Sequence, residues 1–288
     1  MEVFTTMRNL VQLSDTHVLP MDADRLQGID TLQNVRDVLQ IVEDSGLRPD
    51  ALVVSGDLAN HGEPESYRRL RTELDSAASR LGTQIVVAIG NHDARPAFRE
   101  IMLDQSPTDE PIEYVRWIGG LRLIILDSTV PGVAYGEVRP EQLEWLSEQL
   151  SKPAEEGTLL VLHHPPVPDA TPLAGLLTLH GASDLEAVVT GTDVLGVLAG
   201  HAHHPITAAF GDAFCYAAPA TAYSVDPLLL EQRTLRGVQG GGFGLIRVVN
   251  RRAVALTVSL PSSGIETYRH DLNDAVVHRL IGAQPAAA

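Results

Sequence analysis

The chain has 288 residues, 44% hydrophobic and 20% charged, enough apolar side chains to bury a core, so a disordered protein is excluded. A formal net charge of -16 argues against tight binding to duplex nucleic acid or anionic lipid. Cys215 is the one cysteine, which excludes an intrachain disulfide and a cysteine zinc cluster. The one lysine, Lys152, lies outside any Gly-Lys-Ser/Thr context, so a phosphate-binding loop of that type is absent too.

The first ninety residues alternate between short apolar runs and helical patterns. Strands are predicted at Leu10–Leu13, Ala51–Val54 and Ile85–Ile89. Helices are predicted between them, one around residues 32–42 and one from Pro64 to Leu81. This βαβαβ order indicates a parallel sheet covered by helices.

The rest of the chain is predicted to be partly antiparallel. Gly119-Gly120 joins two apolar runs as a hairpin, and Pro140 begins a third helix. The last third has an all-β pattern. Strands are predicted at Glu113–Ile118, Leu121–Leu126, Thr158–Leu162, Val194–Ala199, Ile206–Phe210, Ala213–Ala217, Phe243–Val249 and Ala253–Leu260. We expect one domain over residues 1–282 and a flexible tail over 283–288, because no linker composition interrupts the chain.

Polar side chains follow five of the predicted strands at the point where each strand ends. In an open α/β sheet, ligands bind outside the carboxyl ends of the strands, so these side chains are expected to converge on one crevice. The five groups are Ser14-Asp15-Thr16-His17, Ser55-Gly56-Asp57, Gly90-Asn91-His92-Asp93, His163-His164 and Gly200-His201-Ala202-His203.

Carboxylate, amide and imidazole donors without a thiolate suit Mn, Fe, Co or Zn. If the chain is extended, residues two apart point the same way, so Asp15 and His17 could face one ion, as could His201 and His203. Seven candidate ligands exceed what one tetrahedral ion uses. Two ions about 3.5–4 Å apart could share a carboxylate, activate water and clamp both oxygens of a displacement at phosphorus.

For the other polar residues, a structural or orienting role is the favoured interpretation. His164 and His204 are predicted to lie beside ligands and orient them. His61 and His180 are predicted to be loop residues, and Asp127, which ends another apolar run, is predicted to be structural.

Taken together, these motifs resemble the five-block signature of the calcineurin-like metallophosphoesterases, in the family's order over residues 10–204. Three longer stretches resemble the bacterial class III cyclic nucleotide phosphodiesterases, whose relatives include glycerophosphodiesterases. They begin at Gly56-Asp57-Leu58-Ala59, Leu126-Asp127-Ser128 and Leu162-His163-His164-Pro165-Pro166.

The resemblance implies a four-layer α/β/β/α sandwich with two central mixed sheets. It implies that one ion, often iron, is held by Asp15, His17, Asp57 and His203, and a second, often manganese, by Asp57, Asn91, His163 and His201. Zn or Co is an alternative metal. The family motif, and nothing else in the sequence, selects His163 over His164.

The implied activity is hydrolysis of a phosphodiester, most of all 3′,5′-cyclic AMP to AMP, by a hydroxide bridging the two ions. His92 would be the catalytic residue at the leaving oxygen, and His17, Asn91, His92 and His203 would contact substrate. Glycerophosphodiesters and 2′,3′-cyclic nucleotides remain alternative substrates, and a non-catalytic metal-binding or cyclic-nucleotide sensor protein is the least favoured reading.

The expected setting follows from what the sequence lacks. No stretch is apolar and long enough to span a membrane, and residues 1–9 lack the pattern of a signal peptide, so a cytoplasmic enzyme is expected. The resemblance also implies a homodimer.

Overall fold

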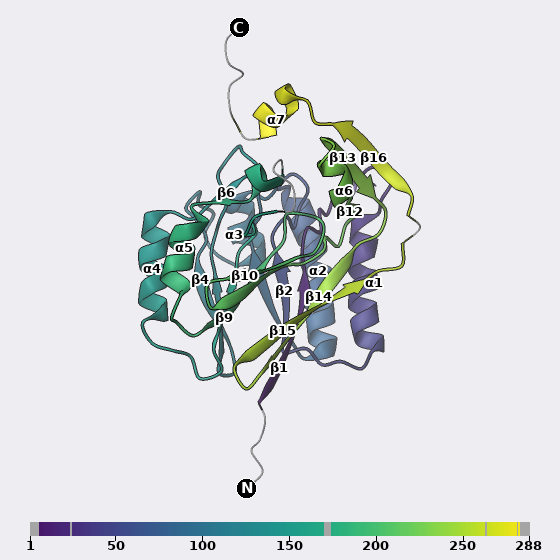
Figure 1. Ribbon diagram of the computed structural model, residues 1–288. Coiled ribbons are helices and arrows are strands. Elements are labelled where there is room, and N and C mark those ends of the chain that lie inside the picture. The colour runs from purple at the N-terminus through teal and green to yellow at the C-terminus, as the bar shows by residue number, and fades with distance from the viewer. Residues whose placement is uncertain (1–5, 24, 170–173, 263, 281, 283–288) are drawn as a thin grey trace.

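The computed structural model (Figure 1) describes residues 6–23, 25–169, 174–262, 264–280 and 282. The flexible tail predicted at 283–288 lies outside these residues. The elements of the body are β1 (Met7–Leu13), α1 (Thr31–Asp44), β2 (Ala51–Ser55), α2 (Pro64–Leu81), β3 (Gln84–Ala88), α3 (Arg95–Met102), β4 (Tyr114–Ile118), β5 (Leu121–Ile125), β6 (Gly136–Glu137), α4 (Pro140–Leu150), β7 (Thr158–Val161), a 3-10 helix (Ala174–Leu177), β8 (Leu179–His180), α5 (Ala182–Val189), β9 (Val194–Ala199), β10 (Ile206–Phe210), β11 (Ala213–Ala217), β14 (Gly242–Val249) and β15 (Arg252–Ser259).

Two mixed sheets form the centre of the body. One has the strand order β15-β14-β1-β2-β3 and the other β10-β11-β9-β7-β5-β4. Helices α1 and α2 lie on the outer side of the first sheet, and α4 and α5 on the outer side of the second (Figure 1). The predicted four-layer α/β/β/α sandwich is confirmed.

Strand β2 shows why its sequence is apolar throughout. Leu52 and Val54 pack toward the helices, whereas Ala51 and Val53 pack toward the second sheet. A strand buried on both faces reads as an unbroken hydrophobic run. Two apolar layers between helices and sheets, and one between the two sheets, therefore supply the burial that stabilises the body.

The predicted strands and the three longer helices agree with the structure to within a few residues at their ends. Sequence reasoning missed α3 and α5, which are eight residues long and bury only two side chains each. Two buried positions give too short a periodic pattern to identify a helix.

The last third of the chain is not all-β, contrary to the prediction. It contains α6 (Pro227–Leu230) and α7 (Asp274–Leu280), together with β12 (Ser224–Val225), β13 (Thr234–Val238) and β16 (Glu266–Asp271). Strands β12, β13 and β16 form a separate three-stranded sheet. We call residues 223–238 and 265–280 the C-terminal unit. Figure 1 shows it above the body, at the end toward which β1 and β2 run.

Within the parts of the chain that the structure covers, none of the helices has both the length and the hydropathy needed for a membrane span.

Candidate metal centre

Backbone hydrogen bonds lock the loops that follow the central strands against one another. The Asp15 N–H donates to the Gly56 carbonyl and the His17 N–H to the Asp57 carbonyl, each at 3.0 Å. On the second sheet, the Gly200 N–H donates to the His163 carbonyl at 2.9 Å. The five polar groups predicted to converge therefore do lie in one crevice, at the carboxyl ends of strands from both sheets.

Two clusters of donor atoms occupy this crevice. Ligand atoms of Asp15, His17, Asp57 and His203 lie within 4.8 Å of one another, and all four residues are buried. Ligand atoms of His163, His164 and His201 form the second such cluster. Nε2 of His17 is only 3.0 Å from Nε2 of His203.

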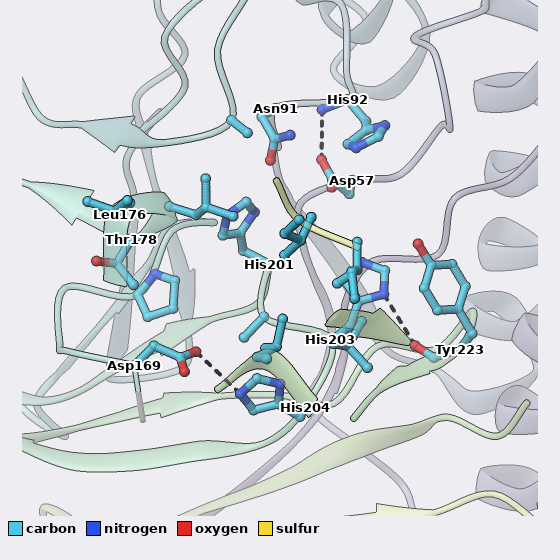
Figure 2. Close-up of a pocket in the computed structure, with 18 of the residues that line it drawn as sticks. Asp57, Asn91, His92, Asp169, Leu176, Thr178, His201, His203, His204 and Tyr223 are labelled. Carbon is cyan, nitrogen blue, oxygen red and sulfur yellow. Dashed lines mark hydrogen bonds and ion pairs between the residues drawn. The ribbon is translucent and has the colours of Figure 1, made fainter. Parts of the chain in front are cut away.

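Asp57 lies between the two clusters. Its Oδ2 atom is 3.6 Å from Nε2 of His17 and 3.4 Å from Nε2 of His163. Oδ1 of Asp57 accepts the His92 backbone N–H at 2.8 Å, which fixes the carboxylate in place (Figure 2). One oxygen thus faces a member of each cluster, which is the position that a bridging carboxylate needs.

The arrangement of protons fits a cation between these side chains. Nδ1 of His17 faces the Asn60 side-chain oxygen and Nδ1 of His203 faces the Tyr223 carbonyl, both at 3.2 Å. Each ring must place its proton on Nδ1 to donate to these oxygens, so the two Nε2 lone pairs face each other. A metal ion between them would satisfy both lone pairs.

Burial and neighbouring charges shift the pKa values of the residues in the two clusters. Burial lowers the pKa of His17 and of His203 below the usual range. Burial also disfavours the Asp57 carboxylate, but the neighbouring imidazoles, His163 foremost, hold its pKa well below the usual range. Burial disfavours a charged His163 as well, but Asp57 raises its pKa to about 9. Asp57 and His163 therefore stabilise each other's charged forms.

The backbone at the predicted ligands has an unusual conformation. Asp15, His17, Asp57, His201 and His203 have φ between +42° and +69°. Non-glycine residues adopt this left-handed region at a cost and cluster there at functional sites.

Asp15 and His17 lie together as predicted, but the predicted reason, an extended chain, is wrong, and the prediction that His201 and His203 share one site is also wrong. Asp15 and His17 share a cluster through their left-handed turns. His201 and His203 belong to different clusters. Strand alternation fails here because the polar residues lie beyond the strands, where backbone turns decide the direction of each side chain.

Glycines before three of the predicted ligands allow the loops to approach closely. A Cβ atom at Gly56 would lie 2.2 Å from His163 Nδ1, and one at Gly200 would lie 1.8 Å from the Ser14 hydroxyl. At Gly90, a Cβ atom would lie 2.2 Å from the Asp57 backbone nitrogen. Neighbouring loops could not pack this closely with any other residue.

The residues predicted to contact substrate have different exposures. Asn91, His92 and His203 line a cavity of about 190 Å³ above the centre, whereas His17 is only 1% exposed. Asn91 directs its Oδ1 toward His163 Nε2, at 3.2 Å. His92 is exposed at the cavity, and its Nδ1 lies 2.8 Å from the Asn60 carbonyl.

Several residues that the sequence left without a role support the site. Asp93 accepts backbone N–H groups of Leu58, Ala59 and Gly90, and so ties the loops after β2 and β3 together. Its place inside the motif Gly90-Asn91-His92-Asp93 was the available signal. The Asn60 side-chain oxygen orients the His17 ring, and the Tyr223 backbone carbonyl orients the His203 ring. No sequence pattern identifies either residue.

Two predicted structural residues can be placed directly. Asp127 is buried, pairs with Arg95 at 2.8 Å and accepts the Ile112 N–H, a structural arrangement. His164 is fully buried, with its ring 4.5 Å from that of His201 and its Nδ1 2.9 Å from the Ser128 hydroxyl. It lies beside the predicted ligands, and its donor atoms reach one of the two clusters.

A family model described as calcineurin-like phosphoesterase matches residues 8–205, which contain every predicted ligand. The chain belongs to this family, as the sequence motifs indicated.

Relatives with names of their own are similar over most of the chain. A cAMP/cGMP dual specificity phosphodiesterase of Mycobacterium tuberculosis is 40% identical over 90% of this chain and 80% of its own length. A 3′,5′-cyclic adenosine monophosphate phosphodiesterase of Escherichia coli is 29% identical over 76% and 78%. A glycerophosphodiester phosphodiesterase of Enterobacter lignolyticus is 28% identical over 75% and 78%.

Solved structures agree on the fold. A purple acid phosphatase from yellow lupin superposes with a TM-score of 0.61 at 12% identity, covering 99% of this chain and 57% of its own.

Proposed function

We propose that this protein is a metal-dependent phosphodiesterase that hydrolyses 3′,5′-cyclic nucleotides, most of all cyclic AMP to AMP. The observation that carries the phosphodiesterase proposal is the position of Asp57 Oδ2, which faces imidazole nitrogens of both donor clusters. The choice of cyclic nucleotides is supported by the relatives from Mycobacterium tuberculosis and Escherichia coli, whose names carry that activity.

Two ions, Fe and Mn as the first choice, are proposed to occupy the centre. Asp15, His17, Asp57 and His203 would hold the first ion. Asp57, Asn91, His163 and His201 would hold the second. His163 is preferred to His164 because its Nε2 lies 3.4 Å from Asp57 Oδ2 and 3.2 Å from Asn91 Oδ1.

When bound, the two ions would activate water and neutralise charge on the phosphoryl oxygens. The chain's own contribution is to hold the donors rigidly. His163 illustrates this: its Nδ1 donates to the Ser55 carbonyl at 2.9 Å, which aims Nε2 at Asp57.

His92 is proposed to protonate the leaving oxygen. Its Nδ1–H donates to the Asn60 carbonyl, so a second proton on the ring must reside on Nε2. The ring is exposed at the cavity beside Asn91 and His203, where the phosphate would lie. A ribose 3′ alkoxide is a poor leaving group, so proton donation there lowers the barrier.

The test is a steady-state comparison of substrates with protein reconstituted with Mn²⁺. Cyclic AMP, cyclic GMP, 2′,3′-cyclic AMP and glycerophosphodiesters would be assayed together. We expect the highest kcat/KM for a 3′,5′-cyclic nucleotide. Higher kcat/KM for a glycerophosphodiester would overturn the assignment of substrate, and no turnover of any diester would overturn the enzyme assignment.

His180→Ala is the matched control for histidine substitutions in the site. His180, predicted to be a loop residue, instead lies on β8; it is exposed, its ring stacks on that of Tyr135 at 4.1 Å, and it belongs to neither donor cluster. It should keep metal content and most activity.

A further inference from the structure

The cavity above the metal centre has an apolar wall that comes from the C-terminal unit. Val225, Leu230, Leu235, Tyr268, Leu272 and Val277 line the same cavity as Asn91, His92 and His203. The match to the phosphoesterase family ends at residue 205, before this unit begins. The wall is therefore built outside the segment that carries the metal ligands.

The wall is the open side of a small apolar core. Val225, Leu230 and Leu272 are buried against one another, and Leu235 and Val277 are partly buried against them. Half-covered leucine and valine side chains at a cavity leave apolar surface that an apolar group of a ligand could cover.

Aromatic rings connect this wall to the metal centre. The Tyr223 ring lies 4.5 Å from that of His203, and the Tyr268 ring meets the Tyr223 ring edge-on at 5.5 Å. Tyr268 lies flat against β13, where a Cβ atom at Gly237 would come within 2.1 Å of its ring. Gly237 thus sets how far the Tyr268 ring can withdraw from the cavity.

Two polar side chains of the described residues at this cavity face other groups of the protein. His204 pairs with Asp169 at 3.3 Å, and the Thr178 hydroxyl donates to the Gly175 carbonyl at 2.9 Å (Figure 2 labels His204, Asp169 and Thr178). Among the described residues, the side of the cavity formed by the C-terminal unit offers ring faces and aliphatic side chains, a better match to an aromatic ring than to a glycerol or ethanolamine headgroup.

We propose that the C-terminal unit is a specificity element, whose wall binds the aromatic ring of a diester while the body binds the phosphate. Leu235 and Tyr268 are the residues that determine this preference. The proposal rests on the proposed function, because it names the part of the substrate that lies beside the same metal centre.

The adenine ring can be isolated by comparing two ligands that the enzyme does not consume. AMP and ribose 5-phosphate share the ribose and the phosphate and differ by the base alone. Their dissociation constants would be measured by calorimetry on Mn²⁺-loaded protein. We expect AMP to bind about tenfold tighter or more, the range that apolar contacts in a pocket supply.

Leu235→Ala and Tyr268→Ala should each weaken AMP binding by about tenfold and leave ribose 5-phosphate binding unchanged. Leu235→Met, which conserves volume, should restore the AMP preference. Leu228→Ala is the control within the unit, because Leu228 on α6 is 74% exposed and does not line the cavity. Leu235→Ala and Tyr268→Ala should also raise KM for cyclic AMP with little change in kcat.

The outcomes separate this proposal from the proposed function. Equal affinity of the wild type for the two ligands, or equal losses for both ligands in Leu235→Ala, would overturn the specificity element even if cyclic AMP is hydrolysed. If the protein binds AMP more tightly than ribose 5-phosphate but hydrolyses no diester, the specificity element is supported and the proposed phosphodiesterase activity is overturned.

Discussion

The metal centre and the C-terminal unit are built in opposite ways, although they border the same cavity. The centre lies at the ends of buried central strands, and backbone hydrogen bonds between loops fix its ligands. The C-terminal unit is a three-stranded sheet with two short helices around three buried side chains. The centre can hold five left-handed residues because the whole sandwich supports it, whereas the unit, with one at Arg233, has little burial to oppose further strain.

Asp57→Ala is expected to have the largest effect and to act on the centre alone. Removing the carboxylate between the two clusters deprives both ions of a ligand and removes the charge that separates them. Elemental analysis should find well under one ion per chain, and diester hydrolysis should fall to background. Retention of two ions by this variant would contradict the bridging role of Asp57.

Metal removal should abolish catalytic activity without unfolding either region. The apolar layers of the sandwich pack without any ligand residue, so the fold does not depend on the ions. Chelation should abolish activity, leave the far-UV circular dichroism spectrum intact, and be reversed by Mn²⁺. A spectrum that collapses on chelation would show that the ions hold the fold together.

His92→Ala should keep both ions and slow catalysis by about 10²–10⁴-fold with cyclic AMP, the usual contribution of a proton donor. An aryl diester should lose much less, because nitrophenolate leaves without a proton. The measurement is kcat/KM for both substrates in wild type and variant. Similar losses for the two would leave His92 as a phosphate-binding group and remove its role as an acid.

Arg233→Ala should give the smallest effect and should be confined to the C-terminal unit. The Arg233 guanidinium donates to the Leu272 carbonyl at 2.9 Å and pairs with Asp274. Losing such contacts at a partly exposed site costs about 1 kcal/mol. Hydrogen exchange should speed up in residues 265–280 and stay unchanged in β1 and β2.

Arg36→Ala is the matched control for that experiment, because Arg36 makes a similar surface pair with Glu73 between α1 and α2. It should leave exchange in residues 265–280 unchanged. Faster exchange there in both variants would show that the two regions are not independent, and loss of metal from Arg233→Ala would show the same.

The two regions also differ in how far the sequence predicts them. The central strands are unbroken apolar runs, the helices α1 and α2 have clear apolar periods, and the polar motifs follow strands in a recognisable order. The crevice could therefore be predicted, down to Asp57 and the glycine before it. The left-handed turns at Asp15 and His203 could not, because the supporting hydrogen bonds come from other loops.

The C-terminal unit could not be predicted from the sequence, for a physical reason. Leu235 and Leu272 lie 37 positions apart. Leu235 is on the five-residue strand β13 and Leu272 lies in the connection between β16 and α7, so neither belongs to a segment long enough for a periodic pattern. Tyr268 lies on β16, which alternates weakly and is mostly exposed. Only the tertiary arrangement shows that these side chains face the metal ligands across one cavity.

The predicted ligands in the left-handed backbone region set folding stability against metal binding. Glycine would relax the backbone at Asp15, His17, Asp57, His201 or His203, yet glycine has no side chain to hold an ion. Each position therefore sacrifices about 1 kcal/mol of folding stability for a donor atom. Variants selected for heat resistance in a metal-free screen should drift toward glycine at these positions, and so lose the catalyst while improving the scaffold.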